Sequence, residues 1–395
     1  KDGTLRFCID FRRLNDCTKK DAYPLPKIEE CLDCLNGAQY FCTMDLASGY
    51  WQVAVHPEDR EKTGFITHQG LFEWIVMPFG LCNAPATFCR LMENVLSDIV
   101  WNQCLVYLDD IICMGQSFKR TLENLEAVFV RLRSSNLKLK PKKCELFREK
   151  VEYLGHEVSR DGIRPSPNKV VTLHDCKIPV TITEVKSFLG FCSYYRKFLP
   201  EFSTIAAPLI ALTKSKVKCD TNTVDCRNAF AKLKHLLLEL PKLHYVTPGA
   251  VFQLDTDASE TAIGACLSQL VEVAGKTEER PIAFASKTLN RTRRNYCTTK
   301  KELYSIVYFM RYWRNYTANS MVHIRTDHGS LRWLINFGKS HSGGGSAMYM
   351  RWCTELYSYQ PWQISHRAGT LHLNADGASR LKKTHVGIYG KPTRP

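Results

Sequence analysis

The feature that most constrains this chain is a pair of adjacent aspartates, Asp109 and Asp110, inside an apolar stretch. Residues 104–108 and 111–114 are almost entirely hydrophobic, so the pattern predicts a hairpin with the acidic pair at its turn. Two carboxylates between apolar strands are costly unless cations neutralise them. Two divalent ions roughly 3.5–4 Å apart would do so, and nucleotidyl transfer needs such a pair. Because successive strand residues face opposite sides, Asp109 is favoured over Asp110 as a ligand unless the turn redirects one of them.

The acidic pair alone leaves two interpretations open, because aspartates are common at turns that have no catalytic role. Asp45 ends another apolar segment, residues 40–46, which predicts a strand followed by a bend at Gly49. Asp45 is therefore either a third carboxylate of the same site or the cap of a turn.

The composition favours a folded chain with a polyanionic partner. A length of 395 residues suits two or three domains, and a hydrophobic content of 44% is too high for disorder. The net charge of +15 suits nucleic acid, and a basic surface that only aids solubility is the alternative. No apolar run approaches the ~18 residues that a membrane helix needs, so no membrane partner is expected.

The 17 cysteines are scattered along the chain. Cys31 and Cys34 have C-x-x-C spacing, but no second pair follows at the spacing of a zinc site, and the apolar periodicity places both on a helix. Packing is therefore the better interpretation, and a reducing compartment fits the pattern best.

Apolar periodicity and Pro/Gly breaks predict three folded units and a tail. In the second unit Thr181 and Glu184 have the spacing of a helix capping box. The polar start at residues 1–4 looks like a hairpin tip, so the chain is expected to begin inside a domain. The predicted segments are 1–160 (strands and helices), 161–243 (mainly helical), 244–382 (strands around a long helix) and 383–395 (a basic tail, expected to be disordered).

Four separated carboxylates in the third segment form a second candidate site. Each has an ordinary explanation as a turn residue, a capping-box residue or a helix cap. Their positions at strand ends and helix starts nevertheless predict convergence at one end of a sheet, where they would repel one another without metal ions. These residues are Asp257, Glu302, Asp327 and Asp376, with Asp255 as a lesser candidate on the same strand face.

Residues 76–88, which read V-M-P-F-G-L-C-N-A-P-A-T-F, resemble a block found in reverse transcriptases of Gypsy-type LTR retrotransposons. Further matching words occur in the family's order and spacing at 8–15, 44–50, 107–110 and 153–156. The words around the second set of carboxylates, at 256–259, 301–303, 325–328 and 374–380, resemble the ribonuclease H domain of the same elements. The resemblance covers the chain up to about residue 381.

The resemblance implies a role for each matching residue. Tyr50 corresponds to the aromatic gate that excludes a 2′-hydroxyl, with simple packing as the alternative. Phe79 and Gly80 correspond to the loop beside the incoming nucleotide, and Arg6 to a triphosphate-binding arginine. Leu154 and Gly155 look like the primer grip, and the implied catalytic and metal-binding residues are Asp45, Asp109 and Asp110 at the first site and Asp257, Glu302, Asp327 and Asp376 at the second.

The resemblance also implies a fold and an activity. The expected fold is an α+β right-hand polymerase with fingers, palm and thumb, followed by an α/β ribonuclease H-like domain with a mixed sheet. The expected activity is RNA-directed DNA synthesis plus hydrolysis of the RNA strand in RNA–DNA hybrids, with two Mg²⁺ ions per active site and Mn²⁺ as an alternative. The expected partners are an RNA template, a DNA primer, the RNA–DNA hybrid and deoxynucleoside triphosphates.

Other implications of the resemblance concern the context of the chain. Protease and integrase parts are expected in a full-length Pol polyprotein, a homodimer is left open, and a cytoplasmic location in virus-like particles is expected, with the nucleus as an alternative. The fingers strands that the family carries before Lys1 are missing from this sequence, which leaves nucleotide grip and template contact open. His366 and His372 do not match the loop histidine of related ribonucleases H and stay unassigned.

Two alternative functions remain at this level. One is a non-catalytic nucleic-acid-binding remnant of a decayed or host-adopted element, and the other is a chain in which only the ribonuclease H site works. All seven carboxylates are retained, which weighs against decay, since a single-base change converts Asp into Asn or Gly.

Overall fold

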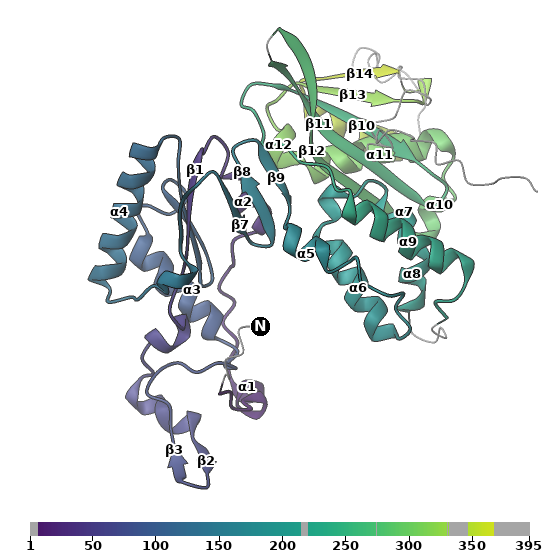
Figure 1. The fold of residues 1–395 in the computed structure, drawn as a ribbon. Coiled ribbons are helices and arrows are strands. Elements are labelled where there is room, and N and C mark those ends of the chain that lie inside the picture. Colours follow the sequence, from purple (N-terminus) through teal and green to yellow (C-terminus); the bar gives the residue numbers. More distant parts are fainter. Residues whose placement is uncertain (1–6, 215–219, 274, 330, 332–346, 367–395) are drawn as a thin grey trace, which may run out of the picture. The chain divides into compact units, whose positions relative to one another are not determined.

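The computed structural model describes residues 7–214, 220–273, 275–329, 331 and 347–366. The chain consists of two compact units, Lys1–Ile163 and Arg164–Pro395. Figure 1 labels their helices and strands. None of the described helices has both the length and the apolar character that crossing a membrane requires.

The first unit is built on an antiparallel sheet of four strands in the order β4-β5-β1-β6. Two amphipathic helices cover the sheet and bury Phe88, Met92 and Val128 together with Met44. The predicted hairpin around Asp109 is therefore confirmed. The elements are β1 (Tyr40–Asp45), β4 (Cys104–Tyr107), β5 (Asp110–Gly115), β6 (Glu145–Arg148), α3 (Ala84–Leu96) and α4 (Phe118–Ser134).

Two smaller sheets extend the first unit (Figure 1). One is a hairpin of β2 (Phe65–Thr67) and β3 (Gly70–Phe72), and the other contains β7 (Lys150–Tyr153), β8 (His156–Ser159) and β9 (Gly162–Pro165). Cys31 is buried on a helix, as its apolar periodicity predicts. Cys34 caps the C-terminus of that helix and is exposed, so the packing interpretation is wrong for Cys34. The helical segments are α1 (Arg12–Cys17), α2 (Ile28–Asp33) and the 3-10 helices η1 (Gly49–Gln52), η2 (Pro57–Thr63) and η3 (Pro141–Lys143).

The second unit contains a mixed sheet of five strands in the order β12-β11-β10-β13-β14. The three strands β12, β11 and β10 pair in antiparallel fashion, whereas β13 runs parallel to both β10 and β14. The strands and the long helix predicted for the segment 244–382 are present among the described residues. The strands are β10 (Val251–Ala258), β11 (Ala262–Val273), β12 (Lys276–Thr288), β13 (Val322–Thr326) and β14 (Trp362–His366).

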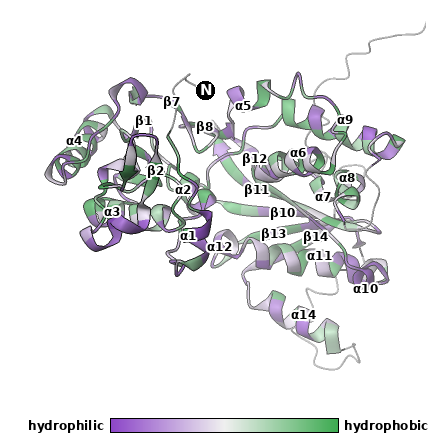
Figure 2. Ribbon diagram, turned by 90° about the horizontal axis from the view of Figure 1, so that it is seen from below, coloured by the Kyte–Doolittle hydropathy of each residue, from purple (hydrophilic) through white to green (hydrophobic). Residues whose placement is uncertain are grey.

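Helices lie on both faces of the mixed sheet, and Figure 2 shows the hydrophobic strands between them. On one face the long helix α11 packs with α14 against Leu254 and Ile324. On the other face the segment from η4 (Arg196–Phe198) to α7 (Phe202–Ile205) packs on β12, where the Ser203 backbone N–H donates to Ser286 Oγ at 2.8 Å. The helices of that first face and their neighbours are α10 (Arg291–Arg294), α11 (Thr298–Tyr312), α12 (Arg314–Thr317) and α14 (Ala347–Tyr357).

The mainly helical segment predicted at 161–243 belongs to this second unit from Arg164 onward. Its capping box forms as predicted, because Thr181 Oγ1 accepts from the backbone N–H of Glu184 and the Glu184 carboxylate accepts in return. The three-part division itself stays a prediction, and the tail at 383–395 lies outside the described residues. The helices are α5 (Pro167–Val171), α6 (Ile182–Tyr194), η4 (Arg196–Phe198), α7 (Phe202–Ile205), α8 (Ala207–Leu212) and α9 (Val224–Leu238).

Candidate active sites

The first candidate site forms at the turn between β4 and β5. Tyr107 pairs with Asp110, so the turn itself consists of Leu108 and Asp109 only. Leu108 adopts a left-handed φ of 55°, which a branched residue rarely accepts. This tight turn takes Asp109 out of the strand alternation, which removes the argument that the two aspartates must face opposite sides.

Three carboxylates meet at this turn. Asp45, the last residue of β1, is the register partner of Asp110 in β5. Burial raises the pKa of Asp109, and the charges of Asp45 and Asp110 raise it further. Loss of solvent contact and then the Asp45 charge raise the pKa of Asp110. The charges of Asp45, Asp109 and Asp110 therefore influence one another, and the net effect on Asp109 and Asp110 is a raised pKa.

Lys143, in η3, supplies positive charge at this turn by forming an ion pair with the Asp45 carboxylate. Lys143 also lowers the pKa of both Asp109 and Asp110. Sequence reasoning missed this residue, and its only signal is a basic run just before Cys144.

The fit of these residues to metal ions rests on one atom and on the charge balance. Oδ1 of Asp109 is buried and has no hydrogen-bond partner, an arrangement that costs free energy unless a cation completes it. Among the described residues, no group of three Asp, Glu, His or Cys side chains is already arranged to hold a metal ion. At this turn the Asp45 carboxylate pairs with Lys143 instead. The donor set, three carboxylates with a single lysine, fits hard divalent cations.

The predicted nucleotide residues lie beside this acidic turn. The Tyr50 ring packs against Phe79 at 5.7 Å and against Phe88 at 5.5 Å between ring centroids. Burial and then the Asp109 charge raise the pKa of Tyr50, so its hydroxyl stays protonated. Gly80 follows Phe79 with a φ of 99°, a conformation that favours glycine. Tyr50, Phe79 and Asp109 are therefore brought together, whereas Arg6 lies outside the described residues.

The predicted primer-grip residues form a second tight turn. Tyr153 pairs with His156 across β7 and β8, which leaves Leu154 and Gly155 at the turn with φ values of 46° and 69°. His156 Nδ1 lies 2.8 Å from the Leu154 carbonyl oxygen. Burial, with Asp110 among the contributing charges, raises the pKa of Tyr153, so this hairpin begins near the acidic turn.

The second candidate site lies at one end of the mixed sheet. Asp255 of β10 is the parallel partner of Arg325 of β13, and two residues further along these chains come Asp257 and Asp327. Glu302, in the first turns of α11, joins them. The convergence predicted for three of the four carboxylates is therefore present, and Asp376 lies outside the described residues.

Glu302 is the most perturbed group of this site. Its side chain is buried, and burial raises its pKa to about 8, with further contributions from Asp327 and Asp257. Oε2 of Glu302 has no hydrogen-bond partner. A buried carboxyl with a free oxygen among acidic neighbours fits divalent cations in the same way as Asp109 does.

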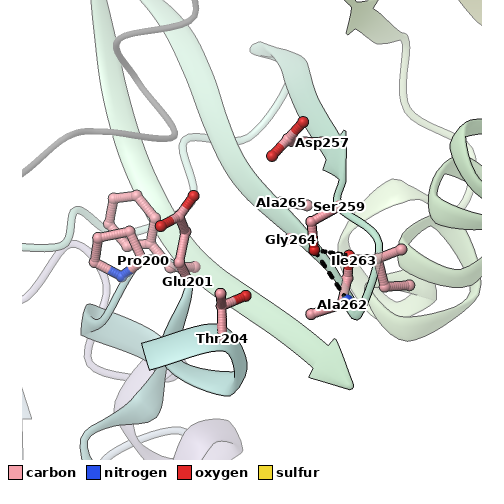
Figure 3. Close-up of a pocket in the computed structure, with 10 residues that line it drawn as sticks. Pro200, Glu201, Thr204, Asp257, Ser259, Ala262, Ile263, Gly264 and Ala265 are labelled. Carbon is pink, nitrogen blue, oxygen red and sulfur yellow. Dashed lines mark hydrogen bonds between the residues drawn. The ribbon is translucent and has the colours of Figure 1, made fainter. Parts of the chain in front are cut away.

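A pocket opens beside Asp257, lined by residues of β10, β11 and β12 and by α7 with the two residues before it. Figure 3 shows the Asp257 carboxylate on one side and Glu201 with Thr204 on the other. Glu201 has a φ of 50° and precedes α7. No sequence pattern pointed to Glu201, because its approach to β10 depends on the packing of a helical segment about 50 residues away in the chain.

Asp255, the lesser candidate for metal contact, is engaged in an ion pair within the sheet. Its fully buried carboxylate forms an ion pair with Arg325, whose guanidinium also binds Glu279 at 2.6 Å. His366 lies beside the site, because its Nε2 is 3.0 Å from the backbone carbonyl oxygen of Asp327. His372 lies outside the described residues.

The two units together define a class: a polymerase palm with three carboxylates at a β-turn, joined in one chain to a ribonuclease H-like sheet with converging carboxylates. The family described as reverse transcriptase (RNA-dependent DNA polymerase) matches residues 1–158, and the RNase H-like domain found in reverse transcriptase matches residues 247–359. The chain belongs to the reverse transcriptase–ribonuclease H region of Gypsy-type retrotransposon Pol polyproteins.

Two Pol polyproteins from Drosophila melanogaster are similar to almost the whole of this chain. The Pol polyprotein of transposon 297 from Drosophila melanogaster is 41% identical over 377 residues, which cover 95% of this chain and 34% of the polyprotein. The gypsy Pol polyprotein from the same species is 34% identical over 388 residues, covering 95% of this chain and 36% of the polyprotein. The chain thus spans about a third of the length of these relatives.

Solved structures confirm the predicted fold class. A foamy viral protease-reverse transcriptase in complex with dsDNA matches with a TM-score of 0.77 at 22% identity, covering 93% of this chain and 76% of that chain. The corresponding complex with an RNA/DNA hybrid matches with a TM-score of 0.70 at 20% identity, covering 98% of this chain and 50% of that chain.

Proposed function

We propose that this chain is an RNA-directed DNA polymerase that also hydrolyses the RNA strand of RNA–DNA hybrids during retrotransposon replication. The observation that carries the proposal is the pair of buried, unpartnered carboxylate oxygens, one on Asp109 and one on Glu302. Each lies among further carboxylates, Asp109 within the residues matched by the reverse transcriptase family and Glu302 within those matched by the RNase H-like domain.

At the first site Asp45, Asp109 and Asp110 would hold two Mg²⁺ ions, with Mn²⁺ as an alternative. When bound, these ions supply activation of the primer 3′-hydroxyl and neutralise charge on the leaving pyrophosphate. Tyr50 presents its ring beside the acidic turn and excludes a 2′-hydroxyl, while Gly80 lets the backbone approach the nucleotide closely. Arg6 would bind the triphosphate and the turn at Leu154 and Gly155 the primer strand.

At the second site Asp257, Glu302, Asp327 and Asp376 would hold the metal pair, which supplies an activated water for hydrolysis of the RNA strand. Glu302 retains its proton near neutral pH in the absence of metal, because its pKa is about 8. It must release that proton to become a ligand, so metal binding at this site is coupled to pH.

The proposed partners are an RNA template, a DNA primer, RNA–DNA hybrids and deoxynucleoside triphosphates. The net charge of +15 suits these polyanions, and the foamy viral enzymes of similar fold were solved with dsDNA and with an RNA/DNA hybrid. The proposed location is the cytoplasm, in virus-like particles, with the nucleus as an alternative. Protease and integrase are the proposed further parts of a longer polyprotein. A homodimer remains a further option.

Primer extension on an RNA template and cleavage of hybrid RNA, both with Mg²⁺, test the proposal in one preparation. Asp109→Asn should abolish extension and spare cleavage, whereas Asp257→Asn should do the reverse. Asp98→Asn removes an exposed aspartate that pairs with Arg131 outside the acidic turn, and it should leave both activities intact. Nucleic-acid binding without either activity in the unmodified chain would contradict the proposal and favour a non-catalytic remnant, while cleavage alone would restrict function to the second site.

A further inference from the structure

Two asparagines tie α1 and the segment that follows it to the loop that carries Phe79. Asn15 Nδ2 donates to the carbonyl oxygen of Gly80 at 2.8 Å, and the backbone N–H of Cys82 donates to Asn15 Oδ1 at 2.8 Å. A single carboxamide thus satisfies a backbone acceptor and a backbone donor two residues apart, as a neighbouring strand would.

Asn83 repeats the arrangement in the opposite direction. The backbone N–H of Asp21 donates to Asn83 Oδ1 at 3.0 Å, and Asn83 Nδ2 donates to the carbonyl oxygen of Lys19 at 2.9 Å. The ion pair between Arg90 and Asp21 at 2.6 Å strengthens this end. We call these four hydrogen bonds of Asn15 and Asn83 the asparagine clamp.

The clamp holds the loop at Phe79 and Gly80, whose backbone lies close to the neighbouring residues Ile9 and Phe11. Gly80 has a φ of 99°, and a Cβ built on it would lie 3.4 Å from both Ile9 O and Phe11 Cδ2. Phe79, just before it, packs on Tyr50 and also on Trp51 at 5.7 Å between centroids. The Asn15 bonds grip the backbone on both sides of Leu81, so they fix where Phe79 and Gly80 stand relative to Tyr50.

We infer that Asn15 is a positioning residue for the incoming deoxynucleotide, acting through Phe79 and Gly80. The inference rests on the proposed polymerase function and deepens it. Asn15 makes both of its bonds to the nucleotide loop, whereas Asn83 uses its side chain to hold the connecting segment at residues 19–21. Loss of the Asn15 bonds therefore loosens the nucleotide pocket and leaves the acidic turn in place, which raises KM for the nucleotide more than it lowers kcat.

The test uses Asn15→Asp in the full chain, with steady-state primer extension on an RNA template. Aspartate keeps the size of asparagine and can still accept from the Cys82 N–H, but it cannot donate to Gly80 O. KM for the deoxynucleotide should rise about fivefold to tenfold, kcat should fall less than threefold, and KM for the template–primer should stay unchanged. Discrimination against ribonucleotides should weaken as well, because Phe79 packs on Tyr50.

Asn83→Asp is the matched control, because it removes one donor at the end of the clamp further from Phe79. It should raise the nucleotide KM less than twofold. Hybrid-RNA cleavage by the same Asn15→Asp preparation should equal that of the unmodified chain, and circular dichroism melting should show that the variant is folded.

An unchanged nucleotide KM in Asn15→Asp, or an equal change in kcat and in both KM values, would overturn the positioning role while leaving the polymerase proposal intact. A similar loss in both asparagine variants would assign Asn15 to the general stability of the clamp. An unmodified chain that fails to extend primers contradicts the proposed function and with it this inference.

Discussion

Asp45 and Asp110 stand directly opposite each other in the antiparallel pairing of β1 with β5. Like charges in facing positions destabilise a sheet, and Lys143 pairs with only one member of the set. The acidic turn is therefore a place where stability without metal is sacrificed for the ability to bind cations.

Replacing Asp110 with asparagine should expose this cost. In EDTA, Asp110→Asn should raise the free energy of unfolding by about 0.5–1 kcal/mol, since one of two facing charges is removed. Urea melts followed by circular dichroism would measure the change, and primer extension should be lost in the same variant. The control Asp98→Asn should show no gain, because it removes an aspartate with its own arginine partner. An equal or lower stability for Asp110→Asn would contradict this account.

Gly49 is predicted to be irreplaceable next to the acidic turn. A Cβ on Gly49 would lie 2.9 Å from Phe88 Cζ and 3.1 Å from Asp109 Oδ1, so alanine must displace a buried ring or the carboxylate. Gly49→Ala should cost about 1–3 kcal/mol of stability and reduce primer extension at least tenfold, by estimates for overpacking and misplacement. Gly190→Ala, in α6 where nothing lies within 4 Å of the new Cβ, should instead be neutral or slightly stabilising. Normal extension by Gly49→Ala would refute the close contact.

The pKa of Glu302, about 8 in the folded chain, predicts a pH-dependent stability without metal. At pH values below the ordinary pKa of glutamate, the Glu302 carboxyl is protonated in both the folded and the unfolded state. As pH rises toward 8, the unfolded state releases a proton that the folded state retains, so folding loses stability. Glu302→Gln cannot ionise, and it should gain stability over the unmodified chain, on the order of 3 kcal/mol at pH 8 and little at pH 4.5.

Thermal melts in EDTA across that pH range would measure the effect, with the exposed Glu260→Gln as the control. A gain for Glu302→Gln that is the same at every pH would show that packing, and not the proton, explains it. Hybrid-RNA cleavage should be lost in Glu302→Gln at all pH values.

The sequence predicted those parts of the sites that depend on local patterns. The hairpin at Asp109 follows from apolar runs on both sides, and the helix at Thr181 follows from its capping box. Lys143 and Asn15 could not be predicted, because each reaches a residue more than 60 positions away, and nothing in a local pattern encodes such a contact. The turn at Leu108 also escaped prediction, since its left-handed backbone is unusual for leucine.

Local pattern also fails to predict the role of Asp255. Strand alternation places Asp255 on one face with Asp257, whereas in the folded chain its carboxylate forms an ion pair with Arg325. This pair joins β10 to β13 two residues before Asp257 and Asp327, so it fixes the strand ends that carry the two carboxylates. Arg325→Met should cost about 3–5 kcal/mol, because the Asp255 carboxylate would remain buried without its partner.

The double variant Arg325→Met with Asp255→Leu should recover most of that loss, since it removes the buried charge together with its partner. Urea melts of the two single variants and the double variant form a double-mutant cycle that measures the coupling between Arg325 and Asp255. If hybrid-RNA cleavage returns along with stability, the ion pair serves to hold the strands. If stability returns and cleavage stays low, the ion pair also sets the spacing of Asp257 and Asp327. A double variant whose loss of stability equals the sum of the two single losses would contradict both outcomes.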